Sequence, residues 1–408
     1  MKQGKTLRGA LVAATVLVLL GARPSGAAYT TLVNNGAPEN RVDIVFIGDG
    51  YTQADIDNGT YDSDINALVQ HMFGGTEDPF PRYQNFFNIH KIDVVSNQSG
   101  ADIPDSGVYV DTALGATYGT GANDRLLTVN PGSANLALSA GLSGAFTADI
   151  KPITVNSSKY GGSGVYNGYA VYAGGYAGAG YGGAEIALHE MGHSFGNLAD
   201  EYYTYAEPYP GFEPFKVNVT LESDPAASKW ADWTGYTDPD HPGMSAVGLY
   251  EGGANYEYGI YRPTENSKMK ALGQPFNAVC REALILKIYD CVEPLDVWLD
   301  DALTYTPTTE LWVDVVDPTV IAVEWYVDGA HVPGANGETF TLADYGLTHG
   351  VFDVTARAYD TALGDWVRRD EDNLEMSVTW AIQGNASEPA SVALIGVAVM
   401  VTVRRRRK

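Results

Sequence analysis

Two histidines and a glutamate in one short run have the residue types and the spacing to bind a metal ion and use it. His189 and His193 are four residues apart, so a helix would place both imidazoles on one face, where a single Zn²⁺ can contact both. Glu190 is rotated away from that shared face, which suits a base acting on metal-bound water better than a ligand. The pattern therefore predicts metal-assisted hydrolysis.

The chain after the second histidine must turn back if a third ligand is to reach the metal. Gly196 follows the pattern, and because glycine enters the left-handed conformation cheaply, we expect the helix to end there. The reversal would bring the next carboxylates, Asp200 and Glu201, under the histidines. Three protein ligands leave a fourth position open for water, which is the arrangement of a catalytic zinc site.

A longer string, HEMGHSFGNLADEY, resembles the signature of the IgA-specific metalloendopeptidase family, the igalysins, within the metzincin clan of zinc peptidases. Four other segments resemble this family as well: VDIVFIGDGYT (42–52), FFNIHKIDVVSNQSGAD (86–102), GIYRPTENSKM (259–269) and QPFNAVCREA (274–283). The resemblance covers most of residues 40–290. It implies a zinc endopeptidase acting on extended polypeptide, although no residue here encodes a preference for immunoglobulin A.

One position departs from the clan pattern. Metzincins usually carry the third zinc ligand ten residues after the first histidine, and here that residue is Ala199, which cannot ligate. We therefore expect Asp200, one residue further on, to be the third ligand, with Glu201 as the alternative. Alternatively, Asp200 would not bind the metal itself but would orient a ligand histidine through a hydrogen bond.

The clan also implies a methionine-containing turn beneath the metal. Met269 matches the family pattern best, and Met244 is the competing choice. Some metzincins place a tyrosine two residues after this methionine to stabilise the oxyanion, but Ala271 stands at that position. We expect Tyr202 or Tyr203 to assist the metal in this role.

Composition limits the classes of function. The 408 residues carry a net charge of −25 and no interior cluster of basic residues, which argues against nucleic-acid binding and suits an exported protein. The two cysteines, Cys280 and Cys291, would lie roughly 16 Å apart on one helix, too far for a disulfide unless that helix ends early.

The N-terminus has the three parts of a secretory signal peptide. A basic start is followed by an apolar run, Gly9 to Ala22, and then by small residues that favour cleavage after Ala27 or Ala28. We therefore assign residues 1–28 to a signal peptide.

The C-terminus, residues 384–408, resembles a PEP-CTERM sorting signal. Ser387-Glu388-Pro389 precedes an apolar stretch, 390–403, and the chain ends in RRRRK. The resemblance implies a Gram-negative envelope, transient contact with the inner membrane through the tail, and removal by an exosortase-type enzyme. A plain membrane anchor is the alternative. The protein would be secreted or associated with the cell envelope.

The elements that must position the site indicate an α/β (α+β) metzincin-like domain over residues 29–292. Strands are expected at Val42–Gly48, Ile89–Ser96 and Val165–Tyr172, and a helix at Asp55–Phe73. In metzincins the edge strand before the zinc helix pairs with the substrate, and the resemblance implies this role for Val165–Tyr172, since an exposed edge accepts a peptide backbone. The alternative is a flexible surface loop, because glycine weakens strands.

Residues 293–383 change to strand periodicity, with apolar and polar residues alternating between turns. Asp328-Gly329 is a hairpin signal and Trp325 a candidate core ring. This pattern favours an all-β immunoglobulin-like sandwich, serving as a spacer or binding module.

These observations together favour an exported zinc metalloendopeptidase. Two alternatives stay open: a non-catalytic surface or adhesion protein whose zinc helix is structural, and a zinc hydrolase with a substrate other than a peptide. The presence of Glu190 argues against a purely structural site, which needs no base.

Overall fold

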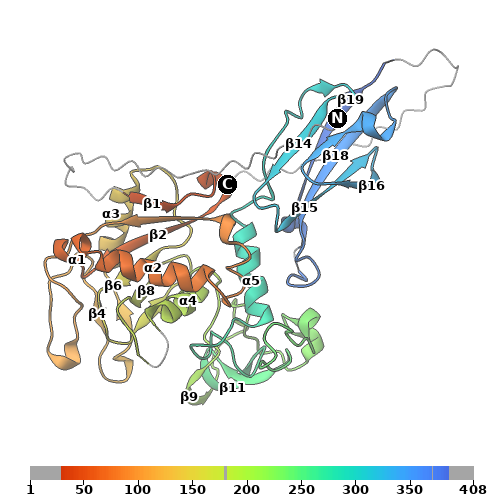
Figure 1. Cartoon of the computed structure of the whole chain (residues 1–408). Helices are drawn as coiled ribbons and strands as arrows, with labels where there is room; N and C mark the ends of the chain where they lie inside the picture. Colours follow the sequence, from red (N-terminus) through yellow and green to blue (C-terminus); the bar gives the residue numbers. More distant parts are fainter. Residues whose placement is uncertain (1–28, 179–181, 370, 386–408) are drawn as a thin grey trace, which may run out of the picture.

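The computed structural model describes residues 29–178, 182–369 and 371–385 (Figure 1). The expected signal peptide and nearly all of the expected sorting tail lie outside these ranges. Within them, every helix is too short or too polar to span a bilayer.

A six-stranded sheet forms the centre of the N-terminal part. Its order is β1 (Tyr29–Val33), β3 (Phe87–Ile92), β2 (Val42–Asp49), β6 (Pro152–Val155), β8 (Ala170–Ala173) and β7 (Gly162–Gly164). The four inner strands are parallel, and the two edge strands, β1 and β7, run antiparallel to their neighbours. Every residue of β2 is buried, as expected for a strand covered on both faces.

Helices cover both faces of this sheet. Ile44 and Phe46 of β2 belong to the core that includes α2 (Thr60–Phe73) and α4 (Gly183–Ser194), whereas Val45 and Ile47 belong to the core beside α3 (Pro131–Leu142). Side chains of a strand point alternately to its two faces, so β2 lies in the middle of a three-layer α/β arrangement.

Smaller elements complete this part of the chain. Two of them are the helices α1 (Gln53–Asp57) and α5 (Ala278–Tyr289). The strands β4 (Thr117–Tyr118) and β5 (Leu127–Thr128) form a two-stranded sheet. A three-stranded sheet has the order β10 (Tyr250–Gly253), β11 (Asn255–Arg262), β9 (Tyr203–Pro208). Figure 1 shows α5 running from the β9–β11 region toward the C-terminal strands. Cys280 lies in α5 and Cys291 just beyond its end, and neither thiol is in a disulfide.

Three sequence expectations were wrong in detail. The helix expected at Asp55–Phe73 is broken into α1 and α2 because Gly59 adopts a left-handed φ of 81°. The strand β3 ends at Ile92, and the following chain leaves the sheet so that Ser96 can bond the β2–α1 turn. The strand expected at Val165–Tyr172 is a hairpin, β7 and β8, turning around Gly168.

The C-terminal part consists of two sheets. One is ordered β12 (Leu295–Trp298), β14 (Glu310–Val315), β17 (Thr339–Thr341); the other is ordered β13 (Thr304–Tyr305), β19 (Glu375–Gln383), β18 (Val351–Asp360), β15 (Ile321–Val327), β16 (Ala330–Asn336). Fully buried Trp325 stacks on Phe340 of the first sheet and Trp380 of the second, at 5.1 and 5.7 Å between ring centroids. The expected hairpin turn is present, with Asp328 and Gly329 both at positive φ.

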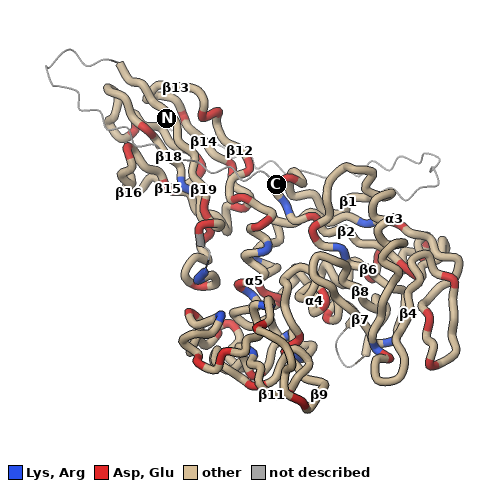
Figure 2. Tube along the Cα trace, turned by 180° about the vertical axis from the view of Figure 1, so that it is seen from behind, with Lys and Arg blue, Asp and Glu red and all other residues tan. Residues whose placement is uncertain are grey.

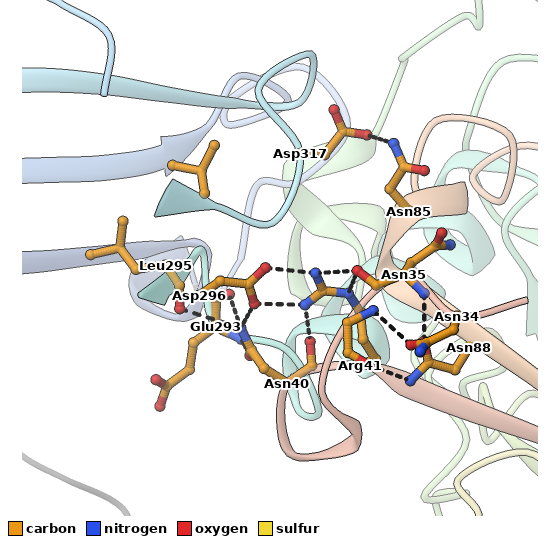
Figure 3. A network of polar contacts seen from close by, with 12 residues as sticks. Asn34, Asn35, Asn40, Arg41, Asn85, Asn88, Glu293, Leu295, Asp296 and Asp317 are labelled. Atoms are coloured by element: carbon orange, nitrogen blue, oxygen red, sulfur yellow. Dashed lines mark hydrogen bonds and ion pairs between the residues drawn. The ribbon is translucent and has the colours of Figure 1, made fainter. Parts of the chain in front are cut away.

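Charged contacts attach the C-terminal strands to the α/β part. In Figure 3 the Arg41 guanidinium lies between the Asp296 carboxylate, which it contacts at 2.6 and 2.7 Å, and the carbonyl of Asn35. A second contact joins Asn85 to Asp317 at 2.8 Å. Both parts carry more acidic than basic residues along the described trace, as Figure 2 shows. The two parts are therefore joined by an ion pair and by side-chain hydrogen bonds despite the excess of negative charge.

Candidate metal centre

Helix α4 places His189 and His193 side by side, with ring centroids 4.9 Å apart and planes at 89°. The Nδ1 of His189 donates to the carbonyl of Lys268 at 2.9 Å, and the Nδ1 of His193 donates to the carbonyl of Leu198 at 2.8 Å. A carbonyl only accepts, so each Nδ1 carries a proton. In the neutral rings the Nε2 lone pairs are therefore free to bind a metal.

The carboxylate of Asp200 meets both rings. Its Oδ1 lies 3.2 Å from the Nε2 of His189 and 3.2 Å from the Nε2 of His193. Ligand atoms held at about 2.0–2.1 Å around a tetrahedral zinc ion are separated by about 3.3 Å. The donor types, two imidazole nitrogens and a carboxylate oxygen, fit a zinc ion, and so does the distance from the carboxylate oxygen to each nitrogen.

The electrostatics of the group favour a positive charge among these atoms. Burial lowers the pKa of His189, but the hydrogen bond to Asp200 and the charges of Glu190 and Asp200 outweigh burial and raise it to about 9. Burial raises the pKa of Asp200, yet its contacts with both histidines hold it well below its usual range. The carboxylate is therefore ionised and available to a cation.

Glu190 lies beside this group. Its carboxylate oxygen and the histidine nitrogens are within 4.8 Å of one another, and the residue is only 8% exposed. Burial raises the pKa of Glu190, and the positive charge of the histidines partly offsets that rise. A carboxylate with a raised pKa is a stronger proton acceptor, which suits a general base.

The glycine strand β7 packs directly on α4. A Cβ on Gly162 would lie 2.6 Å from Oε1 of Glu190, and one on Gly164 would lie 2.4 Å from the Glu190 carbonyl oxygen. Only strand residues without side chains allow this approach. The edge is covered in part, because the amide of Gly162 donates to the carbonyl of Arg125 at 3.3 Å.

The chain reversal after α4 differs from the expectation at Gly196. The left-handed residue is Asn197, with φ 53°, and α4 itself ends at Ser194. Gly196 is required for space, since a Cβ there would lie 2.9 Å from the carbonyl oxygen of Gly192 and 2.9 Å from a methyl carbon of Leu284. The reversal still delivers the next carboxylate to the histidines.

Glu201, the alternative third ligand, lies in a separate buried network. Its carboxylate accepts hydrogen bonds from Ser267 at 2.6 Å and from Asn218 and Asn277 at 3.0 Å, and the residue is fully buried. Within the described ranges, no hydrogen bond or ion pair joins Glu201 to either histidine. The structure thus brings Asp200, and not Glu201, to the imidazoles.

Met269 lies beneath the helix, whereas Met244 lies in a half-buried loop. Met269 is fully buried, and a Cβ on Gly192, between the two histidines on α4, would lie 2.5 Å from its Sδ. The preceding residue, Lys268, supplies the carbonyl that orients His189. The segment 267–269 therefore supports the histidines from below.

Of the two tyrosines considered for the oxyanion, only Tyr202 lies beside the site. Its ring stacks on His189 with 6.5 Å between centroids and 19° between planes, whereas Tyr203 is 49% exposed on β9. Burial, followed by the charge of Asp200, raises the pKa of Tyr202 well above its usual range, so its hydroxyl stays protonated.

Sequence reasoning missed Arg125. Its guanidinium lies 5.5 Å from the ring centroid of Tyr202 and donates to the Tyr202 hydroxyl at 3.5 Å. No motif surrounds this residue, so only the packing of its loop against β7 shows that it belongs near the site.

Comparison with known families gives one match. The family model described as IgA Peptidase M64 matches residues 30–243 and 239–288, which together cover more than half of the chain and include every residue of the site described above. No curated protein matches the chain. The matched region ends before the C-terminal strands, so the family applies to the α/β part and its small sheets.

Proposed function

The chain belongs to the IgA peptidase M64 family of metallopeptidases, and on that premise we propose that it is an exported zinc endopeptidase that hydrolyses extended polypeptides. The observation that carries the proposal is the meeting of His189, His193 and Asp200. Oδ1 of Asp200 lies 3.2 Å from Nε2 of each histidine, close to the spacing of ligand atoms around zinc, and a buried glutamate lies beside the histidines.

His189, His193 and Asp200 would hold the ion, with a fourth position left to water. A zinc ion bound there supplies a Lewis acid that polarises the scissile carbonyl and lowers the pKa of its water. The carbonyls of Lys268 and Leu198 keep both rings in the tautomer that presents Nε2.

Glu190 acts as the general base in this proposal. Its buried carboxylate takes the proton of the attacking water and passes it to the leaving amine. The protonated hydroxyl of Tyr202, beside His189, donates to the oxyanion as the carbonyl becomes tetrahedral. The positive charge of Arg125 next to that hydroxyl favours the same developing negative charge.

We infer the substrate class from the edge strand of the central sheet, whose outer side residues 125–127 cover only in part. β7 is the edge strand, it carries glycine at the contact with α4, and a peptide in extended form can add to such an edge.

Export is also proposed, from the sequence alone. Mass spectrometry of protein secreted by a Gram-negative host would give the mature termini. We expect a chain that begins near residue 28 or 29 and lacks the basic C-terminus; retention of both ends in mature protein would contradict this.

The test of function is cleavage of an unfolded protein such as reduced casein by the purified chain. Glu190→Ala and removal of metal by a chelator should each abolish cleavage, and Glu207→Ala, an exposed residue on β9, should leave it intact. Cleavage that survives Glu190→Ala contradicts the mechanism. Failure to cleave any polypeptide favours a surface protein with a structural zinc helix or a hydrolase of another substrate.

A further inference from the structure

A second cluster of metal-ligating side chains lies one helical turn before His189. It joins His71, in the last turn of α2, Glu77, in the loop that follows α2, and Glu185, in the first turn of α4. The Nε2 of His71 lies 3.4 Å from Oε1 of Glu77 and 3.4 Å from Oε1 of Glu185. One atom from each of three separate segments therefore converges on the same point.

These distances fit a shared ion better than a shared proton. A charge-assisted N–H···O bond is about 2.7–2.9 Å long, yet the solvent-inaccessible Nε2 of His71 makes no hydrogen bond with acceptable geometry. Donation of the one Nε2 proton to both oxygens would be a three-centre bond, and 3.4 Å is long for a bond between charged partners. Ligands held at about 2.0–2.2 Å around a tetrahedral ion are about 3.3–3.5 Å apart, which matches the observed 3.4 Å.

The other oxygen of each carboxylate is already held by a buried ammonium. Lys268 is fully buried, and its Nζ lies 2.8 Å from Oε2 of Glu77 and 2.5 Å from Oε2 of Glu185. Carboxylate ligands of metals are commonly fixed in this way by a hydrogen-bond donor behind them. With His71 as the neutral imidazole that a metal ligand must be, two carboxylates and one ammonium leave one negative charge for a cation to neutralise.

We propose that His71, Glu77 and Glu185 form a second divalent cation site, and that its ion is Zn²⁺. Imidazole with carboxylate oxygens suits Zn²⁺, whereas Ca²⁺ takes six to eight oxygen ligands. The glutamate side chains are 10% and 6% exposed and that of His71 is 32% exposed, so the cluster lies close to the surface. Three protein ligands would leave a fourth position to water.

An ion at this site would stabilise the position of α4, the helix that carries His189 and His193. Glu185 lies one turn before His189 on α4, and Lys268, which holds Glu185, also offers its carbonyl to Nδ1 of His189. An ion bound to His71 and Glu185 would link α2 to α4 at this point. Its role is structural, because no base or open substrate edge adjoins it among the described residues.

The test is zinc stoichiometry of the full chain after metal removal and titration with Zn²⁺, measured by mass spectrometry of bound metal after dialysis. We expect two equivalents for the wild type, one for His71→Ala and one for His193→Ala. His241→Ala is the matched control, since His241 faces a single carboxylate, Asp78, at 3.6 Å, and it should keep two equivalents.

The His193→Ala arm reports on the α4 histidine site alone, so failure of the proposed function and failure of this inference are distinguishable. One equivalent in the wild type that His71→Ala keeps and His193→Ala loses, or two equivalents in His71→Ala, would overturn the second site. If His71→Ala does not fold, His71→Gln replaces it, because its amide keeps the size and polarity but is a weak zinc ligand.

Anomalous diffraction at the zinc edge from wild-type crystals needs no variant. We expect a second peak about 2.0–2.2 Å from Nε2 of His71 and from one oxygen of each glutamate. A map with a peak only at the α4 histidines, and His71 hydrogen-bonded directly to a carboxylate, would contradict the proposal.

Discussion

Replacement of Glu201 by glutamine should show that the two adjacent carboxylates have different roles. We expect Glu201 to stabilise the fold and Asp200 to bind zinc. All the groups that contact the Glu201 carboxylate are donors: the Ser267 hydroxyl, two side-chain amides and the Cys280 thiol at 3.3 Å. In Glu201→Gln, an NH2 group takes the place of one acceptor oxygen, so a donor faces the donors around it. Zinc binding should change far less, because Glu201 makes no contact with the histidines within the described residues.

The expected loss of stability follows from these contacts. A buried hydrogen bond to a charged group contributes about 1.5–3 kcal/mol, and a buried donor left without an acceptor costs a similar amount. Glu201→Gln removes one such bond and leaves one donor unpaired, so the free energy of unfolding should fall by about 3 kcal/mol. At about 2–4 °C per kcal/mol, the Tm should fall by about 6–12 °C.

The assay compares Tm of the metal-free proteins and zinc affinity of the folded ones. Asp200→Asn should show the opposite pattern, with a small change in Tm and zinc affinity reduced at least about 100-fold. Glu207→Gln, an exposed change on β9, should alter neither quantity. A Glu201→Gln chain with normal Tm but no zinc, beside an Asp200→Asn chain that keeps zinc, would refute the assignment.

Three further predictions concern packing and charge. Gly164→Ala puts a Cβ 2.4 Å from a backbone oxygen of α4, so cleavage of casein should fall at least about tenfold while circular dichroism stays native. Asp360→Ala leaves two buried tyrosine hydroxyls without their acceptor and removes the carboxylate that pairs with Arg82, so denaturant unfolding should show a loss of about 3–5 kcal/mol; a loss below about 1 kcal/mol would contradict this. Burial raises the pKa of Glu185, but its contacts with His71 and Lys268 outweigh burial and lower it to about 2. The ionised Glu185 therefore stabilises the fold above its unfolded pKa of about 4.5, and this stabilisation is lost as the pH falls toward 2. Metal-free wild type should be more stable than Glu185→Gln, and this difference in the free energy of unfolding should shrink by about 3 kcal/mol over that pH range.

The histidine pair could be predicted from sequence because its geometry is local. Residues four apart on a helix share a face whatever surrounds them, and α4 does place His189 beside His193. The same holds for the hairpin at Asp328-Gly329, where two residues alone determine the turn. The family membership, expected from extended strings of residues, is also confirmed.

What the sequence could not decide depends on contacts between distant residues. The direction of Glu201 is determined by Asn218, Ser267 and Asn277, which are 17 to 76 positions away in the chain. Gly196 illustrates the same limit, because its small size is required by Leu284 on another helix rather than by its own backbone angles. Arg125 reaches the site through loop packing that no local pattern encodes.

The crystal structure of the zinc-loaded chain, with the ion on α4 located at the zinc edge, tests the central claim most directly. We predict bonds of about 2.0–2.1 Å from that ion to Nε2 of His189, Nε2 of His193 and Oδ1 of Asp200, with water in the fourth position next to Glu190. An ion bound by Glu201 in place of Asp200, or a fourth protein ligand that displaces the water, would contradict it.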